Sequence, residues 1–499
     1  MTDIGPEVRT ASGTVRGRRA EGLSIFRGIP FAQPPVDALR FAAPQPPRRW
    51  DGVREAMEFG PAPPQSGPLR AAGAATGTEW LTVNVWSPDP GAARLPVLVW
   101  IYGGAYMSGS SGDPVYDAAL IAREGLVVVS FNYRVGAEGF AQLCGAPTNR
   151  GLLDQLAALH WVRQNIARFG GDPQRITLCG QSAGAGSIAT LLTMPLAVGL
   201  FQRAIAQSVP GTYYTPALAA DIAAALAARL GASPTVAGLA AIDPQRLADE
   251  VDLLRSELPA HADRWGRVAH GGLLFSPVVD GEVVPDVPWR ALAAGRAAGV
   301  ELLTGHTRDE FRLFPALSGH LGTITEQDAT TALRIFAPGT DGEQAYRSNY
   351  PHACAEDLYE LVHSDAMFRM PTLHLAQAHT AVGGPAFLYE LRWPSPALGG
   401  ALGACHALDI PLLFGTFSSP TTQMLLGEQE PSAEARTLAD EIRRAWTKFA
   451  VHGDPGWAAY RTDQRLTRLL DTDPSTAPYP EEPSRRIWNG HCFDPFDLL

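Results

Sequence analysis

The stretch "TLCGQSAGAGS", Thr177 to Ser187, places a serine between two glycines where one sequence pattern gives way to another. The apolar, β-branched residues before it predict a strand that ends at Cys179, and the small residues from Ala185 onward favour a helix. Ser182 therefore falls in a tight strand-to-helix turn whose small neighbours tolerate a strained backbone. Such a turn holds a side chain above the carboxyl ends of the strands, where ligands of open α/β sheets bind. The stretch predicts either a nucleophile at Ser182 or a glycine-rich turn that only packs against the sheet.

The surrounding segments alternate between strand and helix patterns. The runs "PVLVWIYGG" (96–104) and "LVVVSFNYR" (126–134) are short and β-branched, which is typical of buried strands. Between 152 and 169, apolar residues recur at spacings of three and four, which predicts an amphipathic helix. Gly170 and Gly171 then supply a C-terminal cap, and Pro173 prevents continuation. With a further strand in "LFQRAIAQS", this order predicts an α/β fold with a mostly parallel sheet covered on both faces.

The rest of the chain continues the same architecture after an interruption. Residues 215–275 are rich in Ala and Leu and predict a helical insertion, which could also cover a site. Strand-like runs return at "LLFSPVVDGEVV" (273–284), "VELLTGHT" (300–307) and "AFLYELRW" (386–393). We therefore expect a single domain over residues 1–499 with one insertion, because the sheet resumes where a second domain would otherwise begin.

Composition excludes several classes of protein. A net charge of −11 over 499 residues argues against a nucleic-acid partner, since such binding depends on clustered Lys and Arg. No apolar run reaches the roughly 18 residues that a membrane span needs. The first residues, "MTDIGPEVRT", lack the pattern of a secretory signal. The five cysteines are scattered, with no C-x-x-C pair, which favours reduced thiols in the cytoplasm over disulfides or a zinc site.

A serine nucleophile for acyl transfer needs backbone donors for the developing oxyanion. The stretch "WIYGGAYMSGS" (100–110) places Gly103, Gly104 and Ala105 directly after a predicted strand. The amide of Ala183, directly after Ser182, would face the same developing oxyanion. The alternative interpretation of this stretch is a flexible connection between strand and helix.

The serine also needs a base, and the base needs a carboxylate. Eight of the twelve histidines lie beyond residue 310, so chain order alone does not choose among them. His406 follows a loop-like entry in "GACHALDIPLLFG", whereas His363 sits in a helical pattern and His452 ends one. For the acid, Asp309 and Glu310 both follow a predicted strand, and the residues alone do not separate them.

Many ordered stretches together resemble a known family. The chain is similar over nearly its whole length to the type-B carboxylesterases, the cholinesterase-like branch of the α/β-hydrolases. The matching stretches are "FRGIPFAQPPVDALRF" (26–41), "LTVNVWSP" (81–88), "WIYGGAYMSGS" (100–110), "NYRVGAEGF" (132–140), "GLLDQLAALHWVRQNIARFGGDP" (151–173), "CGQSAGAGS" (179–187), "FSPVVDGEVVP" (275–285), "TGHTRDE" (304–310), "CHALDIPLLFG" (405–415) and "WTKFAVHGDP" (446–455).

The resemblance implies a serine carboxylesterase that works through an acyl-enzyme. Its triad would be Ser182 as nucleophile, Glu310 as acid and His406 as general base. The oxyanion hole would consist of three backbone amides, those of Gly104, Ala105 and Ala183. The expected substrates are carboxylic esters of short to medium acyl chains with aryl or alkyl alcohols. The resemblance implies no metal and no organic cofactor, and a monomer or small homo-oligomer is expected.

The chain departs from the family pattern at a few positions. Gln181 replaces the usual Glu beside the nucleophile, which removes one charge near the site. Pro63 and Trp80 stand where many secreted relatives carry a disulfide pair, which agrees with a cytoplasmic protein. Three other residues stand where glycine is usual: Asp37, Val209 and Phe311. Phe311 adjoins the acid and could alter the carboxylate geometry.

Two alternative functions come from other classes. An interfacial lipase would need an exposed apolar lid, for which the insertion at 215–275 is the candidate. A non-catalytic binding protein of the same family would have lost the nucleophile or its histidine. This chain keeps a candidate for all three triad positions, which argues against the binding protein.

Overall fold

The computed structural model describes residues 5–67, 77–91, 94–427 and 430–499. These residues form two compact units. The first unit comprises Met1–Ala204, Tyr213–Asp286 and Pro495–Leu499, and the second comprises Ile205–Thr212 and Val287–Asp494. Strand β10 (Arg203–Gln207), which the sequence predicts, begins in the first unit and ends in the second.

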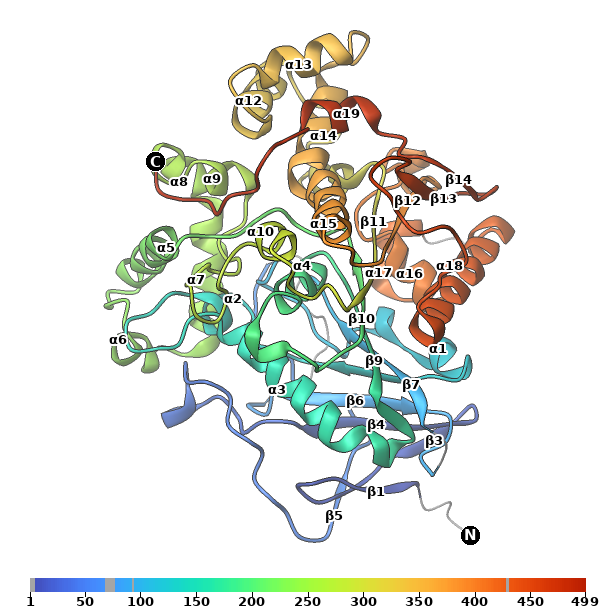
Figure 1. The fold of residues 1–499 in the computed structure, drawn as a ribbon. Coiled ribbons are helices and arrows are strands. Elements are labelled where there is room, and N and C mark those ends of the chain that lie inside the picture. The colour runs from blue at the N-terminus through green and yellow to red at the C-terminus, as the bar shows by residue number, and fades with distance from the viewer. Residues whose placement is uncertain (1–4, 68–76, 92–93, 428–429) are drawn as a thin grey trace. The chain divides into compact units, whose positions relative to one another are not determined.

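The first unit is built on a twisted mixed sheet (Figure 1). Its strands follow the spatial order β9 (Gly171–Gln181), β7 (Leu95–Ile101), β8 (Val127–Phe131), β6 (Thr82–Ser87), β4 (Leu23–Pro30) and β3 (Arg18–Ala20). Strand β7 pairs in parallel with both β8 and β9, and the remaining pairs are antiparallel. A small separate sheet joins β1 (Glu7–Arg9), β2 (Thr14–Arg16) and β5 (Val53–Glu55). The predicted strands at 96–104 and 126–134 are confirmed as β7 and β8, which are buried on both faces.

Helices of the first unit pack around this sheet. Their bounds are α1 (Ala119–Arg123), α2 (Gly136–Phe140), α3 (Arg150–Asn165) and α4 (Ala183–Leu191). The predicted amphipathic helix is confirmed as α3, and a 3-10 turn continues it to Phe169. Gly170 ends this turn with a φ of 86°, the left-handed conformation that a glycine cap supplies without strain.

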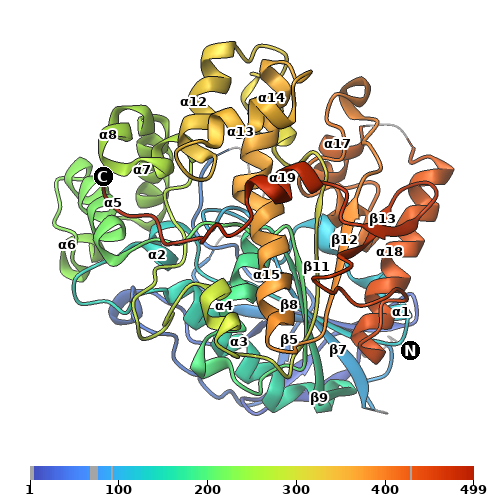
Figure 2. The ribbon, with the colours of Figure 1, turned by 45° about the horizontal axis from the view of Figure 1, so that its top comes forward.

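A run of helices follows Tyr213 in the first unit. They are α5 (Pro216–Arg229), α6 (Val236–Ala240), α7 (Pro244–Ser256), α8 (Ala262–Trp265) and α9 (Arg267–Gly271). The last residues of the chain lie beside α8 in both views (Figures 1 and 2), where the amide of Leu499 donates to the carbonyl of Arg264. The C-terminus therefore helps to hold these helices in the first unit.

The predicted strand at 273–284 is wrong. This segment is irregular apart from an isolated bridge between Tyr214 and Val278. The side chain of Asn149 satisfies the backbone of Val278 instead, since its amide donates to the Val278 carbonyl and its oxygen accepts from the Val278 amide, each over 2.8 Å. Pro277 has no amide to donate to a ladder. An apolar segment can thus be buried without forming a strand, because a side-chain amide takes the backbone hydrogen bonds that a neighbouring strand would otherwise supply.

The second unit contains its own strands in the order β10, β11 (Glu301–Thr307), β12 (Ala386–Leu391), β13 (Leu466–Leu470) and β14 (Ser475–Pro478). Strand β12 is parallel to both β11 and β13, and β14 closes the edge as an antiparallel strand. The predictions at 300–307 and 386–393 are confirmed as β11 and β12.

The helices of the second unit differ in length and role. They are α10 (Pro288–Ala293), α11 (Leu313–Ser318), α12 (Glu326–Phe336), α13 (Gly342–Asn349), α14 (Ala355–Ser364), α15 (Met370–Ala381), α16 (Asp409–Phe414), α17 (Pro420–Leu426), α18 (Ala433–His452) and α19 (Glu482–Ile487). Among the described residues, no helix combines the length and hydropathy that a membrane crossing requires.

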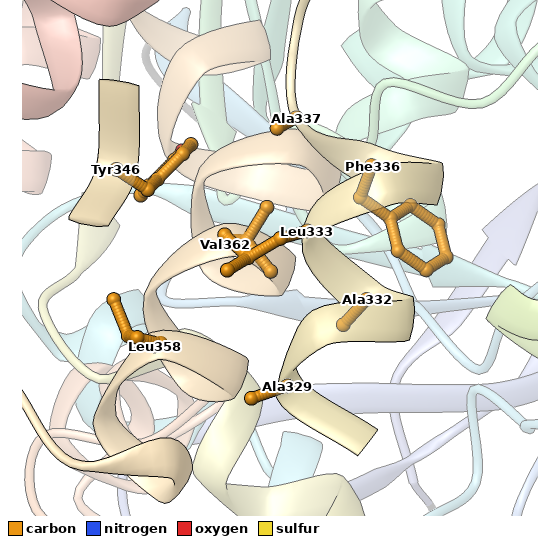
Figure 3. Close-up of a cluster of buried hydrophobic side chains, with 8 residues drawn as sticks. All are labelled: Ala329, Ala332, Leu333, Phe336, Ala337, Tyr346, Leu358 and Val362. Carbon is orange, nitrogen blue, oxygen red and sulfur yellow. The ribbon is translucent and has the colours of Figure 1, made fainter. Parts of the chain in front are cut away.

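Helices α12, α13 and α14 share a local core (Figure 3). A capping box begins α12, where the Thr325 hydroxyl accepts from the amide of Asp328 and the Asp328 carboxylate accepts from the amide of Thr325. The buried side chains are Ala329, Ala332, Leu333, Phe336, Ala337, Tyr346, Leu358 and Val362. This cluster holds α14 in position, and the end of α14 contacts the loop that follows β11.

Candidate active site

Ser182 is the sole residue between β9 and α4, because β9 ends at Gln181 and α4 begins at Ala183. The strand and the helix each extend two residues closer to Ser182 than the sequence predicts. The turn is consequently tighter, and Ser182 has φ 57° and ψ −126°. A non-glycine residue rarely adopts such a conformation, and strained residues of this kind cluster at functional sites. The nucleophile-elbow geometry predicted for the turn is present in the backbone.

The flanking glycines are required by close packing. A Cβ atom on Gly184 would lie 2.0 Å from the carbonyl oxygen of Ile101, and one on Gly180 would lie 2.7 Å from the same oxygen. Neither position has room for a side chain, because the contacting atom belongs to the backbone of the central strand β7. The glycines therefore let α4 begin directly against the end of β7.

The loop after β7 lies beside this turn. A Cβ on Gly103 would lie 3.0 Å from the Cβ of Ser182, so the two backbones approach closely. Gly104, Ala105 and Tyr106 have φ values of 112°, 56° and 59°, and the Gly104 carbonyl accepts from the amides of two residues further on in the turn. Among the described residues, none accepts a hydrogen bond from the amides of Gly104 or Ala105. The first unit thus brings Ser182, Ala183 and the predicted oxyanion loop to one edge of its sheet.

An open pocket adjoins the predicted oxyanion loop within the first unit. Its walls come from four places: the loop at Gly104 and Ala105, the segment 135–138, the face of α7 that carries Leu247 and Val251, and the segment with Pro64, Ser66 and Gly67. Most of the exposed wall is apolar, which suits the hydrocarbon part of a small organic molecule.

Glu310 and His406 meet in the second unit. The His406 Nδ1 and the Glu310 Oε2 are 2.5 Å apart, and both side chains are buried. The amide of Thr307 donates to the other carboxylate oxygen over 2.9 Å, and the amide of His406 donates to the Glu310 carbonyl. Burial by itself raises the pKa of Glu310, but the charge and hydrogen bond of His406 and the Thr307 amide outweigh it and leave this pKa below its ordinary value. Glu310 is therefore a carboxylate aimed at an imidazole.

Asp309 and Glu310, which the residues alone leave as alternatives and between which the resemblance chooses Glu310, have different partners. The Asp309 carboxylate accepts from the guanidinium of Arg308 over 2.9 Å and from the amide of Ala404 over 2.8 Å. The amide of Asp309 in turn donates to the Ala404 carbonyl. Asp309 thus joins the two loops, whereas Glu310 faces the histidine.

The other candidate histidines lie elsewhere in the second unit. His363 stacks on Phe311 with ring centroids 4.1 Å apart, and its Nδ1 lies 2.8 Å from the carbonyl of Tyr359. His452 is exposed and ends α18, as predicted, before the left-handed Gly453. The stacking also answers the question raised by Phe311, because its ring packs on α14 and leaves the Glu310–His406 contact intact.

Several residues around the pair carry no signal in the sequence. The ring centroids of Phe368 and Phe314 lie 4.3 and 5.5 Å from the centroid of the His406 imidazole. Three residues after His406, the Asp409 carboxylate accepts a hydrogen bond from the side chain of Gln207 over 2.6 Å. Burial raises the pKa of Asp409 to about 6. These contacts join segments that are far apart in the chain, so no spacing rule predicts them.

Ser182 belongs to the first unit, whereas Glu310 and His406 belong to the second. In the described ranges, no group of three or more His, Cys, Asp or Glu side chains is arranged to hold a metal ion.

Comparison with known proteins adds sequence evidence. The profile of the carboxylesterase family matches residues 5–476. The chain is 34% identical over 497 residues to the para-nitrobenzyl esterase of Bacillus subtilis, covering 96% of this chain and 97% of that protein. It is 33% identical to the phenmedipham hydrolase of Pseudarthrobacter oxydans, covering 92% and 93%. It is also 31% identical to mouse cholinesterase, covering 94% and 83%.

Solved structures agree with these relatives. A carboxylesterase from Geobacillus stearothermophilus superposes with a TM-score of 0.85 at 32% identity, covering 97% of this chain and 100% of that one. A structure titled as a PNB esterase gives the same TM-score at 34% identity, covering 96% and 99%.

Proposed function

The chain belongs to the carboxylesterase family, has the α/β-hydrolase fold and is a carboxylic-ester hydrolase, and on this premise we propose that it works through a Ser182–His406–Glu310 triad and an acyl-enzyme. One observation carries the proposal: the buried Glu310 carboxylate lies 2.5 Å from Nδ1 of His406. A G-x-S-x-G turn alone occurs by chance, whereas a carboxylate on an imidazole, in the chain order serine, acid, histidine, is what acyl transfer on this fold requires.

The proposed mechanism has two halves. Ser182 attacks the ester carbonyl carbon while Nε2 of His406 takes the hydroxyl proton, and collapse of the tetrahedral intermediate transfers that proton to the leaving alcohol. Water then attacks the acyl-enzyme, with the same nitrogen as base, and releases the acid and the free serine. Glu310 holds the tautomer with the proton on Nδ1 and stabilises the imidazolium that forms in each half.

The oxyanion would be held by the amides of Gly104, Ala105 and Ala183. Support comes from the left-handed φ values of Gly104 and Ala105, which directly follow the Gly103 that closely approaches Ser182, and from the position of Ala183 as the first residue of α4. Each such donor contributes about a hundredfold or more to the rate in other acyl transferases.

We further propose short to medium acyl esters of aryl or alkyl alcohols as substrates. The apolar pocket beside the oxyanion loop and the similarity to a para-nitrobenzyl esterase support this range. The net charge of −11 supports the absence of a nucleic-acid partner, and the scattered cysteines support the cytoplasm. A monomer or small homo-oligomer remains the expected state.

Both units are proposed to form one hydrolase domain in which residues 215–275 are an insertion. The family profile runs through both units without interruption, which supports this view.

The test is hydrolysis of p-nitrophenyl butyrate with and without an organophosphate, followed by peptide mass mapping of the labelled enzyme. We expect one label per chain, on Ser182, with activity lost in proportion to labelling, and no label on S182A. Hydrolysis that survives full labelling, or a label on another residue with Ser182 unmodified, would contradict the proposal.

A further inference from the structure

The pocket beside the oxyanion loop contains an acidic residue that the proposed mechanism does not use. Glu138, in α2, lines the pocket together with Met107, Val135, Leu247 and Val251. Its side chain is 3% exposed, in a wall that is otherwise largely apolar. A buried carboxylate in an apolar wall is a candidate for orienting a ligand, because polar groups in such pockets are few and specific.

The two oxygens of Glu138 differ. Oε1 accepts two hydrogen bonds from the guanidinium of Arg40, over 3.0 and 2.6 Å. Among the described residues, none donates to Oε2, which is itself buried. Buried carboxylate oxygens need donors, and because Glu138 lines the pocket, the pocket is the side from which a donor can approach Oε2: water in the free enzyme and a polar group of the ligand in the complex.

Glu138 is held rigidly. The guanidinium of Arg150 donates to the Glu138 carbonyl over 2.8 Å and also to the carbonyls of Ala137 and Ala141, which fixes α2 from behind. The remaining nitrogen of Arg40 donates to the carbonyls of Ala240 and Ile242, just before α7 begins. The Arg40–Glu138 pair therefore joins two walls of the pocket, and Oε2 keeps a fixed position relative to both.

We propose that Glu138 determines substrate specificity by accepting a hydrogen bond, through Oε2, from an uncharged N–H or O–H group on the arm of the ester that enters this pocket. The inference rests on the proposed function, since it takes the ester carbonyl to lie at Gly104 and Ala105, which line the same pocket. An uncharged donor fits better than a cation, because Arg40 already neutralises the Glu138 carboxylate and Arg255 neutralises Asp252 at the rim.

The experiment compares kcat/KM for esters that differ in one terminal group. In the acyl series, the substrates are the p-nitrophenyl esters of hexanoate, 6-hydroxyhexanoate and 6-aminohexanoate. In the alcohol series, hexyl butyrate is compared with 6-hydroxyhexyl butyrate, with acid release followed by titration. We expect the hydroxyl compound to be preferred about tenfold over its parent in one of the two series, and the ammonium compound to gain nothing.

The variant E138Q turns the acceptor into a donor with almost no change in shape, so the hydroxyl preference should fall below about twofold. The matched control V251A alters an apolar wall and should change both members of a pair alike, leaving the ratio as in the wild type. A folding defect also cancels in this ratio. Should E138Q fail to fold, the double variant R40M/E138M replaces the buried ion pair with apolar groups of similar volume and should abolish the preference.

Three results would overturn the inference: no hydroxyl preference in either series, an unchanged preference in E138Q, or an ammonium compound preferred over the hydroxyl compound. Each of them leaves the proposed function intact, because hydrolysis itself continues. Absence of hydrolysis of every ester would overturn both.

Discussion

The turn at Ser182 and the pair formed by Glu310 and His406 are built by different means. The turn is a local structure, in which Ser182 adopts a strained backbone and two neighbouring glycines lie too close to the end of one strand to carry a side chain. The pair joins residues 96 positions apart, and it depends on side chains, on loop-to-loop backbone bonds and on the packing of α14. Steric exclusion therefore dictates the position of Ser182, whereas hydrogen bonding and burial dictate the positions of Glu310 and His406.

This difference predicts which substitutions disrupt the turn at Ser182 and which disrupt the Glu310–His406 pair. A backbone-dictated turn tolerates changes of distant side chains but not an added methyl group. A side-chain pair tolerates changes in its surroundings only while its hydrogen bonds keep the carboxylate charged and aimed at the imidazole. Four substitutions, each with a control from the same region or of the same residue type, distinguish positioning by the backbone from positioning by side chains.

The largest effect is expected for S182A. Loss of the nucleophile should lower kcat for p-nitrophenyl butyrate about 10⁶-fold without unfolding the chain, since Ala fits the turn. The control S187A removes a hydroxyl from the same helix, where it accepts from Gln155 over 3.0 Å. It should lower stability by about 1 kcal/mol and leave kcat within a few-fold of the wild type. Comparable losses of kcat in the two variants would mean that the turn is only structural.

The next effect separates the two adjacent carboxylates. E310Q keeps the shape of the acid but removes its charge, and kcat should fall about 10⁴-fold because the imidazole loses its oriented tautomer. D309N acts on the loop connection with Arg308 and Ala404, and kcat should stay within about tenfold while stability falls by about 1–2 kcal/mol. Steady-state kinetics and urea unfolding of both variants decide, and a reversed order would assign the acid to Asp309.

The third prediction tests steric control of the turn. G184A should destabilise the chain by at least about 3 kcal/mol, because the new Cβ would lie 2.0 Å from the Ile101 carbonyl oxygen. A Cβ on Gly271, which is also helical, would meet no atom of the described residues within 4 Å, so G271A should be neutral or stabilising by about 0.5 kcal/mol. Both are measured by urea unfolding. Equal, small effects would show that α4 can move away from β7.

The smallest effect concerns pH. Burial raises the pKa of Glu360, whose carboxylate accepts from the Ser364 hydroxyl that in turn accepts from the amide of Phe311. With a folded pKa of about 7 against an ordinary 4.5, Glu360 favours folding below pH 4.5, and this contribution is lost as the pH rises through 7. The stability difference between wild type and E360Q should therefore decline by at most about 3 kcal/mol over that window.

The control for this window is E343Q. Hydrogen bonding to Arg334 lowers the pKa of Glu343, so its contribution is present above pH 4.5 and is lost as the pH falls. The stability difference between wild type and E343Q should consequently change with the opposite sign. Unfolding by urea at a series of pH values measures both differences, and a flat profile for E360Q would mean that Glu360 is charged in the folded chain.

Local patterns in the sequence were good guides where neighbours in the chain decide the structure. The strands β7 and β8, the helix α3 with its Gly170 cap and the turn at Ser182 all follow from periodicity, glycines and β-branched residues. The same reasoning failed at 273–284, where Asn149 from another segment occupies the backbone groups that a strand would use. It also had no means of finding the Arg40–Glu138 pair, whose members are 98 positions apart.

The amino-acid sequence alone was enough for the fold class, the position of the nucleophile turn and the family, because each depends on residues that are adjacent in the chain or on ordered short motifs. The resemblance already named Glu310, but only the tertiary structure showed that Glu310 and not Asp309 contacts His406, stacked the ring of Phe311 on His363, and left one oxygen of Glu138 without a donor among the described residues. The physical reason is that charge and hydrogen-bond partners act through space. The role of a carboxylate depends on the donor that folding brings within hydrogen-bond reach of it. That donor can be far away in the chain, so no sequence spacing encodes the contact.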